Sequence, residues 1–432
     1  MLIKRIRLGL IHIAVAMTLV PINSTLNRVM IKELMISATL VAILASLPYL
    51  LSPLQVAIGS FSDNHPLGGL KRTPYIIIGL LLCVFGVMFT PNSAFLLVDN
   101  PRSGLLMGIL TFGAWGLGYN FATVAYLSLA SEISGEKERG RTIAIMWFMM
   151  ITSIIITAIV LSRLVDPYTP EALLRAFRIV GFTALFLGIF STWGLEKHST
   201  LSPETDKQHS WRTYALTVLS NPQAKLFFGY MIILLVAIFG QDLLLEPYAG
   251  EAFGMTVKAT TRITAIWGSC VLVALLIGGW LERQVDKRKV AKWGALIALF
   301  GFLCIAFGGI LTNTIVFYLG VTALGFGTGL STVSNLSLML DMTIPSNVGL
   351  YIGAWGMASA LARLIGSVLG GVVRDVLTQI TNKPVVAFIV VFSLEAALLG
   401  VSLILLHNLD VKQFRLQSRT EKIIEHIASV DL

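Results

Sequence analysis

The sequence predicts an all-α polytopic membrane protein with twelve transmembrane helices. Of its 432 residues, 56% are hydrophobic and only 13% are charged, and the mean hydropathy is +0.81. Soluble globular domains do not reach these values. A helix needs about 20 apolar residues to cross the hydrocarbon core of a bilayer, and runs of this kind recur along the whole chain.

The predicted spans are apolar runs separated by shorter polar segments. Proline falls within the first two runs and the third run is short, but membrane helices tolerate proline. In chain order the runs cover 8–30, 38–61, 74–90, 104–129, 142–164, 177–195, 226–248, 261–281, 290–311, 316–340, 349–373 and 385–406.

Lysine and arginine are unevenly distributed over the loops. When the N-terminus is placed in the cytoplasm, about two-thirds of the 32 Lys and Arg residues fall in cytoplasmic segments. Because positive loops stay on the cytoplasmic side of a membrane, both termini are predicted to be cytoplasmic. The net charge of +9 is then explained by topology and by contact with anionic membrane lipids. No nucleic-acid partner is expected.

The chain is predicted to consist of two six-helix halves. Residues 114–132 align without a gap on 323–341 and share several Gly, Ser, Thr and Leu residues, while Glu132 matches Asp341 in charge. This pattern indicates a duplication. The expected parts are an N-terminal half over 1–195, a cytoplasmic linker over 196–225, a C-terminal half over 226–407 and a cytoplasmic tail over 408–432.

A second internal similarity follows the second and eighth runs, where a glycine and an acid precede basic residues. The residues are Gly59, Asp63, Lys71 and Arg72 in the first half, and Gly278, Glu282, Lys287 and Arg288 in the second. Two such halves resemble the major facilitator superfamily, whose halves are repeats about an axis normal to the membrane. In that superfamily the acids and bases latch the inner gate. The spacing between Asp63 and the basic pair is longer here.

Three stretches carry a narrower resemblance that covers nearly the whole chain. "STLNRVMIKEL" (24–34), "SDNHPLGGLKRTPYI" (62–76) and "QDLLLEPYAGEAFGM" (241–255) are similar to the signature stretches of the PucC family. That family contains major-facilitator-like proteins associated with bacteriochlorophyll delivery and light-harvesting assembly in phototrophs. The signature residues singled out are Asn27, Arg28, Pro247 and Tyr248.

The resemblance implies a membrane assembly or delivery factor that handles chlorophyll or bacteriochlorophyll. It also implies that the protein lies in a photosynthetic membrane, either a thylakoid or a bacterial inner or intracytoplasmic membrane. Because few histidines, the usual magnesium ligands of pigment proteins, fall within the apolar runs, one or a few transiently held pigments are expected rather than a permanent array. The implied partners are chlorophyll-binding photosystem or antenna subunits and pigment-synthesis enzymes. The alternative function is a proton-coupled secondary transporter of a small solute, or a tetrapyrrole or lipid flippase.

Gln241, Asp242 and Glu246 place polar groups near the outer end of an otherwise apolar run. At positions i and i+4 the two acids are expected to share one helix face, and charges facing lipid are costly. The alternatives are an ion pair that closes the outer face, a role in pigment or substrate binding, and proton coupling. Pro247 is expected to end the helix soon afterwards. The basic candidates for the ion pair are Arg28, Lys258 and Arg262.

Glu395 and Arg363 lie deep in the last two predicted helices. Because these helices are antiparallel and the two residues fall at similar depth, a buried ion pair is predicted. A glutamate neutralised by an arginine can also bind the magnesium of a chlorophyll, since magnesium prefers oxygen ligands. Both interpretations remain open.

Two further residues are candidates for pigment or substrate binding. His12 is one of few histidines within an apolar run, and Asn120 lies beside a glycine-rich segment. Packing between helices is the alternative for each. The sequence contains no cluster with metal-ligand spacing, no nucleophile motif and no phosphate loop. We therefore expect neither catalysis nor a dedicated metal site.

Overall fold

The computed structural model describes residues 2–196, 222–341 and 348–409. Nearly all of the predicted linker and tail lies outside these ranges. The described elements are helices, apart from one isolated bridge between Leu67 and Leu70 in a loop. The predicted all-α class is therefore confirmed, whereas the cytoplasmic placement of the termini stays a prediction.

The first half begins with a helix that changes its hydrogen-bonding pattern midway. After α1, two π-helical turns, η1 and η2, continue the same span. Further along, Gly135 has a φ of 66° inside α6, which makes α6 two helices in sequence. The elements are α1 (Leu2–Ala16), η1 (Pro21–Leu26), η2 (Val29–Glu33), α2 (Ala38–Ala45), α3 (Leu47–Leu50), α4 (Leu54–Asn64), α5 (Thr73–Asp99), α6 (Pro101–Leu164) and α7 (Pro170–Thr192).

The second half contains a comparable series of long helices, with a break after the first. That break is a short 3₁₀ turn, η3, between α9 and α10. The elements are α9 (Pro222–Gly240), η3 (Gln241–Leu243), α10 (Leu245–Phe253), α11 (Val257–Leu281), α12 (Lys287–Ile310), α13 (Thr314–Asp341), α14 (Val348–Thr381) and α15 (Pro384–His407).

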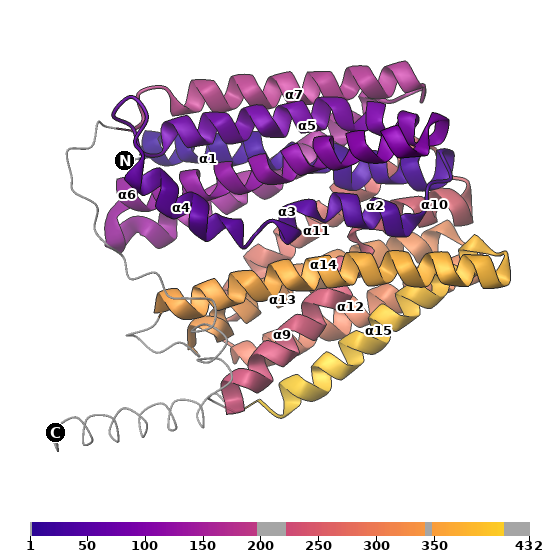
Figure 1. Ribbon diagram of the computed structural model, residues 1–432. Helices are drawn as coiled ribbons and strands as arrows, with labels where there is room; N and C mark the ends of the chain where they lie inside the picture. Colours follow the sequence, from indigo (N-terminus) through magenta and orange to yellow (C-terminus); the bar gives the residue numbers. More distant parts are fainter. Residues whose placement is uncertain (1, 197–221, 342–347, 410–432) are drawn as a thin grey trace, which may run out of the picture.

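Eleven helices in the described part of the chain are long and apolar enough to cross a membrane, one fewer than predicted. The predicted span 38–61 is instead divided into α2, α3 and α4. Pro48 and Pro53 lie at or near these divisions, where proline removes a backbone donor and clashes with the preceding turn. The three short helices follow one another along the bundle (Figure 1), so the segment still runs from one end towards the other.

Glycines allow the same close helix packing in both halves. A Cβ added to Gly118 of α6 would lie 2.5 Å from the carbonyl oxygen of Gly79 in α5. A Cβ added to Gly327 of α13 would lie 2.6 Å from the carbonyl oxygen of Gly294 in α12. Gly118 and Gly327 occupy matching positions in the aligned segments. Small residues let membrane helices approach closely, so the aligned segments have the same structural role.

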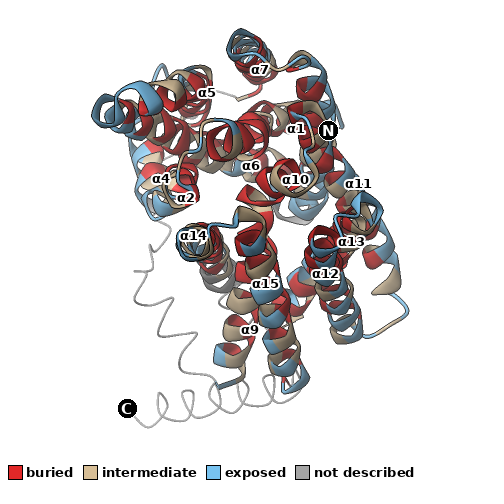
Figure 2. Ribbon diagram, turned by 90° about the vertical axis from the view of Figure 1, so that its right-hand side faces the viewer, coloured by how far each residue is buried: buried red, intermediate tan, exposed pale blue. Residues whose placement is uncertain are grey.

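The residues coloured as buried lie towards the interior of the bundle, and exposed residues lie mostly on its outside (Figure 2). The outward side chains include large apolar groups such as Phe182, Phe186 and Phe190 of α7, each more than half exposed. An exterior of this kind suits a lipid environment. Between the halves, α11 packs on α6 and α14 packs on α2 and α3.

Candidate functional site

Two of the family-like stretches, 24–34 and 241–255, meet between the halves at the end of the bundle where α10 lies (Figure 1). We call their side-chain contacts the interhalf clamp and this end the clamp end. The clamp pairs are Ser24 with Glu246, Arg28 with the Met255 carbonyl, and Lys32 with Glu251. Each pair joins a residue of the first half to one of the second.

Local backbone breaks position the clamp. The segment from Pro21 to Glu33 has π-helical turns, a form that often accompanies functional sites. The seventh predicted span unwinds at η3, so Asp242 lies on a 3₁₀ turn and Glu246 on a new helix. The prediction that they share one helix face is wrong. Pro247 does not end the helix either, because it lies in the first turn of α10, where backbone N–H groups need no helical partner.

Glu246 is held by hydroxyl groups rather than by a base. Its carboxylate is buried, and Oε1 accepts hydrogen bonds from Ser24 Oγ at 2.5 Å and from Thr264 Oγ1 at 2.6 Å. Oε2 has no hydrogen-bond partner in the described part of the chain. Glu246 therefore ties η1 of the first half to α11 of the second.

The predicted ion pairs of the two acids with nearby outer bases are not formed. Arg28 Nη1 contacts Glu33 Oε1 at 2.7 Å, and Lys258 pairs with Asp166. Asp242 pairs instead with Arg363, whose Nη1 lies 3.1 Å from Asp242 Oδ2. The interpretation that an ion pair involves one of the acids is thus right for Asp242, but the partner was misidentified.

The Asp242–Arg363 pair lies where the halves meet. Gln241 Nε2 donates to the other oxygen, Oδ1, at 2.8 Å. The Arg363 guanidinium stacks over the Phe239 ring, 3.4 Å from its centroid, and lies 5.6 Å from the centroid of Tyr49 on α3. Cation–π contacts of this kind are favourable. Arg363 thus connects α14 and α9 to the first half.

Glu395 on α15 does not pair with Arg363, so the predicted buried ion pair is wrong. Its side chain is 4% exposed, and neither carboxylate oxygen has a hydrogen-bond partner among the described residues. Arg363 forms its ion pair with Asp242 instead, because α9 unwinds at η3, the turn that carries Asp242. Glu395 is left as an unpaired buried carboxyl group.

Asp375 of α14 adds a connection between the halves that the sequence did not indicate. Its carboxylate accepts hydrogen bonds from the backbone N–H groups of Ala38 and Thr39, at 3.1 and 2.8 Å, and from the Ser37 hydroxyl at 2.7 Å. Asp375 thereby caps the N-terminus of α2 from the opposite half. An acid at a helix N-terminus is favourable because the free N–H groups there carry partial positive charge.

Replacing Asp375 by alanine is expected to destabilise the contact between the halves by about 2 kcal/mol, because it leaves the N-terminal donors of α2 unpaired. Thermal unfolding of the purified protein in detergent measures this loss. Asp99→Ala, at an exposed position at the end of α5, is the matched control and should leave the midpoint unchanged. An equal effect of both variants would contradict this role of Asp375.

Two cavities adjoin these contacts. The larger, of about 500 Å³, lies at the clamp end and is lined by both signs of charge: Arg28, Lys32 and Lys258 with Glu33, Asp166 and Glu251. The smaller, of about 10 Å³, lies between Asn23, Ser46, Tyr49, Asp242, Arg363 and Ser367. A polar space of that size holds about one water molecule. Polar groups of both halves line each cavity.

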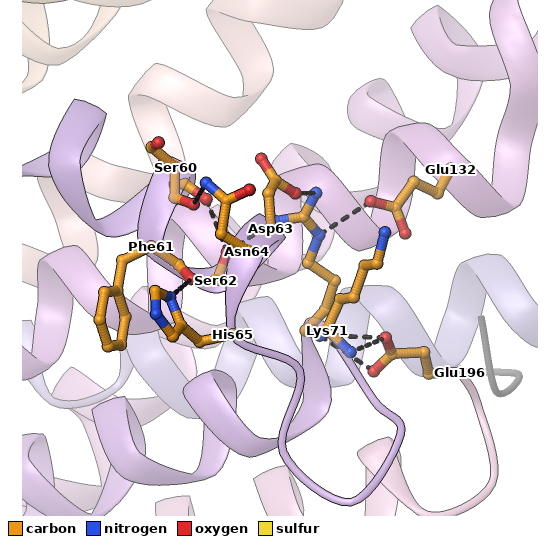
Figure 3. A network of polar contacts seen from close by, with 11 residues as sticks. Ser60, Phe61, Ser62, Asp63, Asn64, His65, Lys71, Glu132 and Glu196 are labelled. Carbon is orange, nitrogen blue, oxygen red and sulfur yellow. Dashed lines mark hydrogen bonds and ion pairs between the residues drawn. The ribbon is translucent and has the colours of Figure 1, made fainter. Parts of the chain in front are cut away.

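The third family-like stretch builds a separate cluster at the opposite end, which we call the latch cluster: Ser62, Asp63, Arg72, Glu132 and Glu196. Figure 3 labels its members apart from Arg72. Buried Arg72 is its centre. Its Nη1 donates to Ser62 Oγ at 2.7 Å, its Nε contacts Glu132 Oε1 at 2.8 Å, and its Nη2 pairs with Asp63. The lengthened loop therefore still brings the acid and the base together.

Glu196 completes the latch cluster from the end of the first half. Its carboxylate accepts hydrogen bonds from the backbone N–H groups of Lys71, Arg72 and Thr73, at 2.7, 3.0 and 2.7 Å. These donors form the N-terminus of α5, which favours a negative group. Lys71 therefore contributes its backbone to this contact.

The second half has a matching but looser arrangement. Lys287 Nζ lies 2.7 Å from Asp341 Oδ2, and Ser337 Oγ donates to Glu282 at 2.6 Å. Partial burial raises the pKa of Glu282, although the Ser337 hydrogen bond and the Lys287 charge oppose this. Asp341 and Glu132, aligned in the sequence, thus both bind the basic residue of their own half.

The remaining signature residues of this end have local contacts. Arg288 donates through Nε to the Leu406 carbonyl at 3.1 Å, so it fastens α12 to the end of α15. A Cβ added to Gly59 would lie 3.4 Å from Val124, and one added to Gly278 would lie 2.5 Å from Val333. Close packing therefore requires a glycine at position 278, whereas position 59 has room for a Cβ.

Polar contacts between the halves are concentrated at the clamp end and the middle of the bundle. Besides the clamp, Thr25 Oγ1 lies 3.0 Å from Thr261 Oγ1, and Lys258 pairs with Asp166. At the latch end, the ion pairs between described residues stay within one half. The structure is therefore closed at the clamp end, which the predicted topology places on the outer side of the membrane.

Four other candidates make contacts inside the helix bundle. Asn120 Nδ2 donates to the Pro48 and Gly116 carbonyls at 2.9 and 2.8 Å, which ties α6 to the broken segment. Asn27 Nδ2 donates to the Asn23 carbonyl at 2.8 Å. Tyr248 OH donates to the Ile305 carbonyl at 3.0 Å. Buried His12 packs on Tyr126, with ring centroids 4.9 Å apart.

Known proteins similar to this chain match it over most of its length. A family model described as "PUCC protein" matches residues 25–414. Protein PucC of Cereibacter sphaeroides is 32% identical over 423 residues, covering 93% of this chain and 91% of that protein. A Rhodobacter capsulatus protein named bacteriochlorophyll synthase 44.5 kDa chain is 28% identical over 403 residues, covering 91% of this chain and 92% of that protein.

Among solved structures, the nucleoside transporter NupG superposes on this chain with a TM-score of 0.73. The match covers 94% of this chain and 98% of that one at 13% sequence identity. An identity this low is informative about the fold alone. It confirms the predicted major-facilitator architecture.

Proposed function

The chain belongs to the PUCC family, and on that premise we propose that it is a membrane assembly or delivery factor for chlorophyll- or bacteriochlorophyll-binding light-harvesting or photosystem complexes. The observation that carries the proposal is the family match over 25–414, which includes the stretches that build both ends of the bundle. The relative named as a bacteriochlorophyll synthase chain supports the class of pigment. The family and the fold are those of PucC and transporter proteins rather than of enzymes.

The clamp suits a protein that opens and closes. Its single ion pair, Lys32–Glu251, joins side chains that are 30% and 22% exposed, and a pair of this kind contributes about 0–1 kcal/mol. Closure therefore rests on several polar and apolar contacts rather than on one strong ion pair. Opening would also part buried apolar side chains, because Leu26 and Met30 of the first half belong to the same hydrophobic core as Leu245 and Ala249 of the second.

The described conformation does not fit a resident chlorophyll. Glu395 and His12 each keep a potential ligand atom without a hydrogen-bond partner, but both side chains are buried. Neither of the two cavities described above is lined by either residue. We therefore propose that pigment is handled transiently, with antenna or photosystem subunits, and possible pigment-synthesis enzymes, as the partners in a photosynthetic membrane.

Combining Asp242→Asn with Glu246→Gln should lower the accumulation of a chlorophyll-protein complex several-fold, because both acids connect the halves. The measurement is the red or near-infrared absorption of membranes from a phototrophic host that lacks its own family member and is complemented with this chain. Glu171→Gln, at an exposed position in α7, is the control. If the folded double variant supports normal accumulation, these acids are not part of the function.

A specific observation also favours transport as a second candidate. The bundle has a transporter fold and is closed at one end by contacts between its halves, as alternating access requires. Solute or tetrapyrrole uptake into liposomes, with and without a proton gradient, tests this candidate. Uptake by a protein that purifies without pigment or antenna partners would favour transport over assembly.

A further inference from the structure

Glu395 is a buried carboxyl group without a hydrogen-bond partner in the described part of the bundle. It lies midway along α15, which packs against α9, α12 and α14. Both of its oxygens are buried and have no hydrogen-bond partner among the described residues. Arg363, the base with which it was predicted to pair, lies on a neighbouring helix. An ionised carboxylate in such surroundings is strongly disfavoured, so the group is retained there in its neutral, protonated form.

The backbone of α9 makes room for this carboxyl group. A Cβ added to Gly240 would clash with Glu395 Oε1 and would lie 3.4 Å from the Gly366 carbonyl oxygen. Gly240 directly precedes η3, which carries Asp242. The Glu395 carboxyl is therefore seated at the point where α9 unwinds, next to the turn that holds the Asp242–Arg363 pair.

We propose that Glu395 is a proton-binding site whose occupancy stabilises closure of the clamp end. The bound species is one proton on the carboxyl group, and its release to water leaves a carboxylate without any other change in covalent bonding. This inference does not depend on the pigment or on the identity of any transported solute.

The link to closure runs through Asp242 and Arg363. A carboxylate at Glu395 would place a second negative charge beside Asp242, and like charges at close range repel strongly inside a protein. Arg363 is the cation that can relieve this repulsion. A shift of its guanidinium towards α15 would weaken its contact with Tyr49 of the first half, and thereby loosen the interface.

Few other charged or titratable groups near Glu395 could cause this loosening of the interface. The helices packed against α15 contribute Asp242, next to η3, Arg363 on α14, and Tyr248 on α10, whose hydroxyl is bonded to the Ile305 carbonyl. Arg374 of α14 also faces α15, where it stacks on Phe388, but it is paired with Asp375. On α12 the charged residues cluster in its first turns, from Lys287 to Lys292, far from Gly240 along the bundle. Asp242 follows two residues after Gly240, which borders the Glu395 carboxyl group, so it is the acid placed beside that group. Since Asp242 is already paired with a base, Glu395 is left as the group that carries the proton.

Infrared spectroscopy tests the proton directly. The folded wild-type protein at neutral pH should show the C=O band of a protonated carboxylic acid, with a downshift in heavy water. Glu395→Gln should remove this band while Glu246→Gln retains it, because Glu246 is held by two hydroxyl donors. A band that disappears with Glu246→Gln and survives Glu395→Gln, or no band at all, would overturn the assignment.

Spin-label distances test the coupling. Cysteines for labelling are placed at Met35 and Ile380, which are 74% and 71% exposed on opposite halves near the clamp end. The wild-type distance should lengthen as the pH rises and the proton is lost, whereas Glu395→Gln, a neutral mimic, should keep the short distance at every pH. The coupling is refuted if the distance between the labels in the wild-type protein does not change with pH, or if the distance in the glutamine variant changes as it does in the wild type.

Discussion

Replacing Arg363 by methionine is expected to destabilise the protein by about 3 kcal/mol, because removal of one partner of an interior ion pair leaves the other charge uncompensated. Asp242 would then keep only the Gln241 amide as a partner. The Asp242 and Arg363 side chains are 26% and 32% exposed, so water offsets part of a larger loss. The midpoint of thermal unfolding in detergent measures the effect.

A second substitution separates charge from packing at this site. Asp242→Asn in the Arg363→Met protein removes the stranded charge and should recover a large part of the lost stability. Arg363 also packs on Phe239, and that contribution stays lost. A single Arg363→Met variant as stable as the wild type would show that the pair does not hold the halves in place.

The next largest effect is expected at Arg72. Arg72→Gln leaves Asp63 and Glu132 close together without their shared cation, and should cost about 2 kcal/mol, since Arg72 is 9% exposed in its side chain while both acids are nearly half exposed. Unfolding in detergent and protease sensitivity of the 65–72 loop are the measurements.

Lys287→Gln is the matched comparison because it removes the corresponding base of the second half. Its side chain is 34% exposed and pairs with one carboxylate, so a loss below about 1 kcal/mol is expected. A larger effect at Lys287 than at Arg72 would contradict the view that the first half carries the tighter latch.

The fold was predictable from the sequence because membrane spans are encoded by simple apolar runs. The boundaries within 38–61 were not, since the consequence of Pro48 and Pro53 depends on packing against α6 and α14. The matched roles of Glu132 and Asp341 were visible in the internal repeat, because residues at equivalent places in a duplicated half meet equivalent neighbours.

The partners of the buried charges were less predictable. Asp242 was expected on a regular helix, and the unwinding of α9 at η3 redirected it to Arg363. That change left Glu395 alone, although residue counting placed it near Arg363. Asp375 had no signal in the sequence, because its partners are backbone groups of a distant helix. Contacts between halves depend on tertiary geometry that the local pattern does not contain.

We propose that this member of the PUCC family must open at the interhalf clamp to assist the assembly of pigment-binding complexes. The most direct test joins the halves at that end. Lys32→Cys and Glu251→Cys, in a background without native cysteines, are linked by a short bismaleimide in a complemented phototrophic host, and absorption of the membranes reports antenna accumulation.

The account predicts that the linked protein supports little antenna accumulation, whereas the Lys32→Cys single variant treated in the same way supports the normal amount. Normal accumulation with the clamp fully linked would contradict the account, because the bundle would then act as a static scaffold.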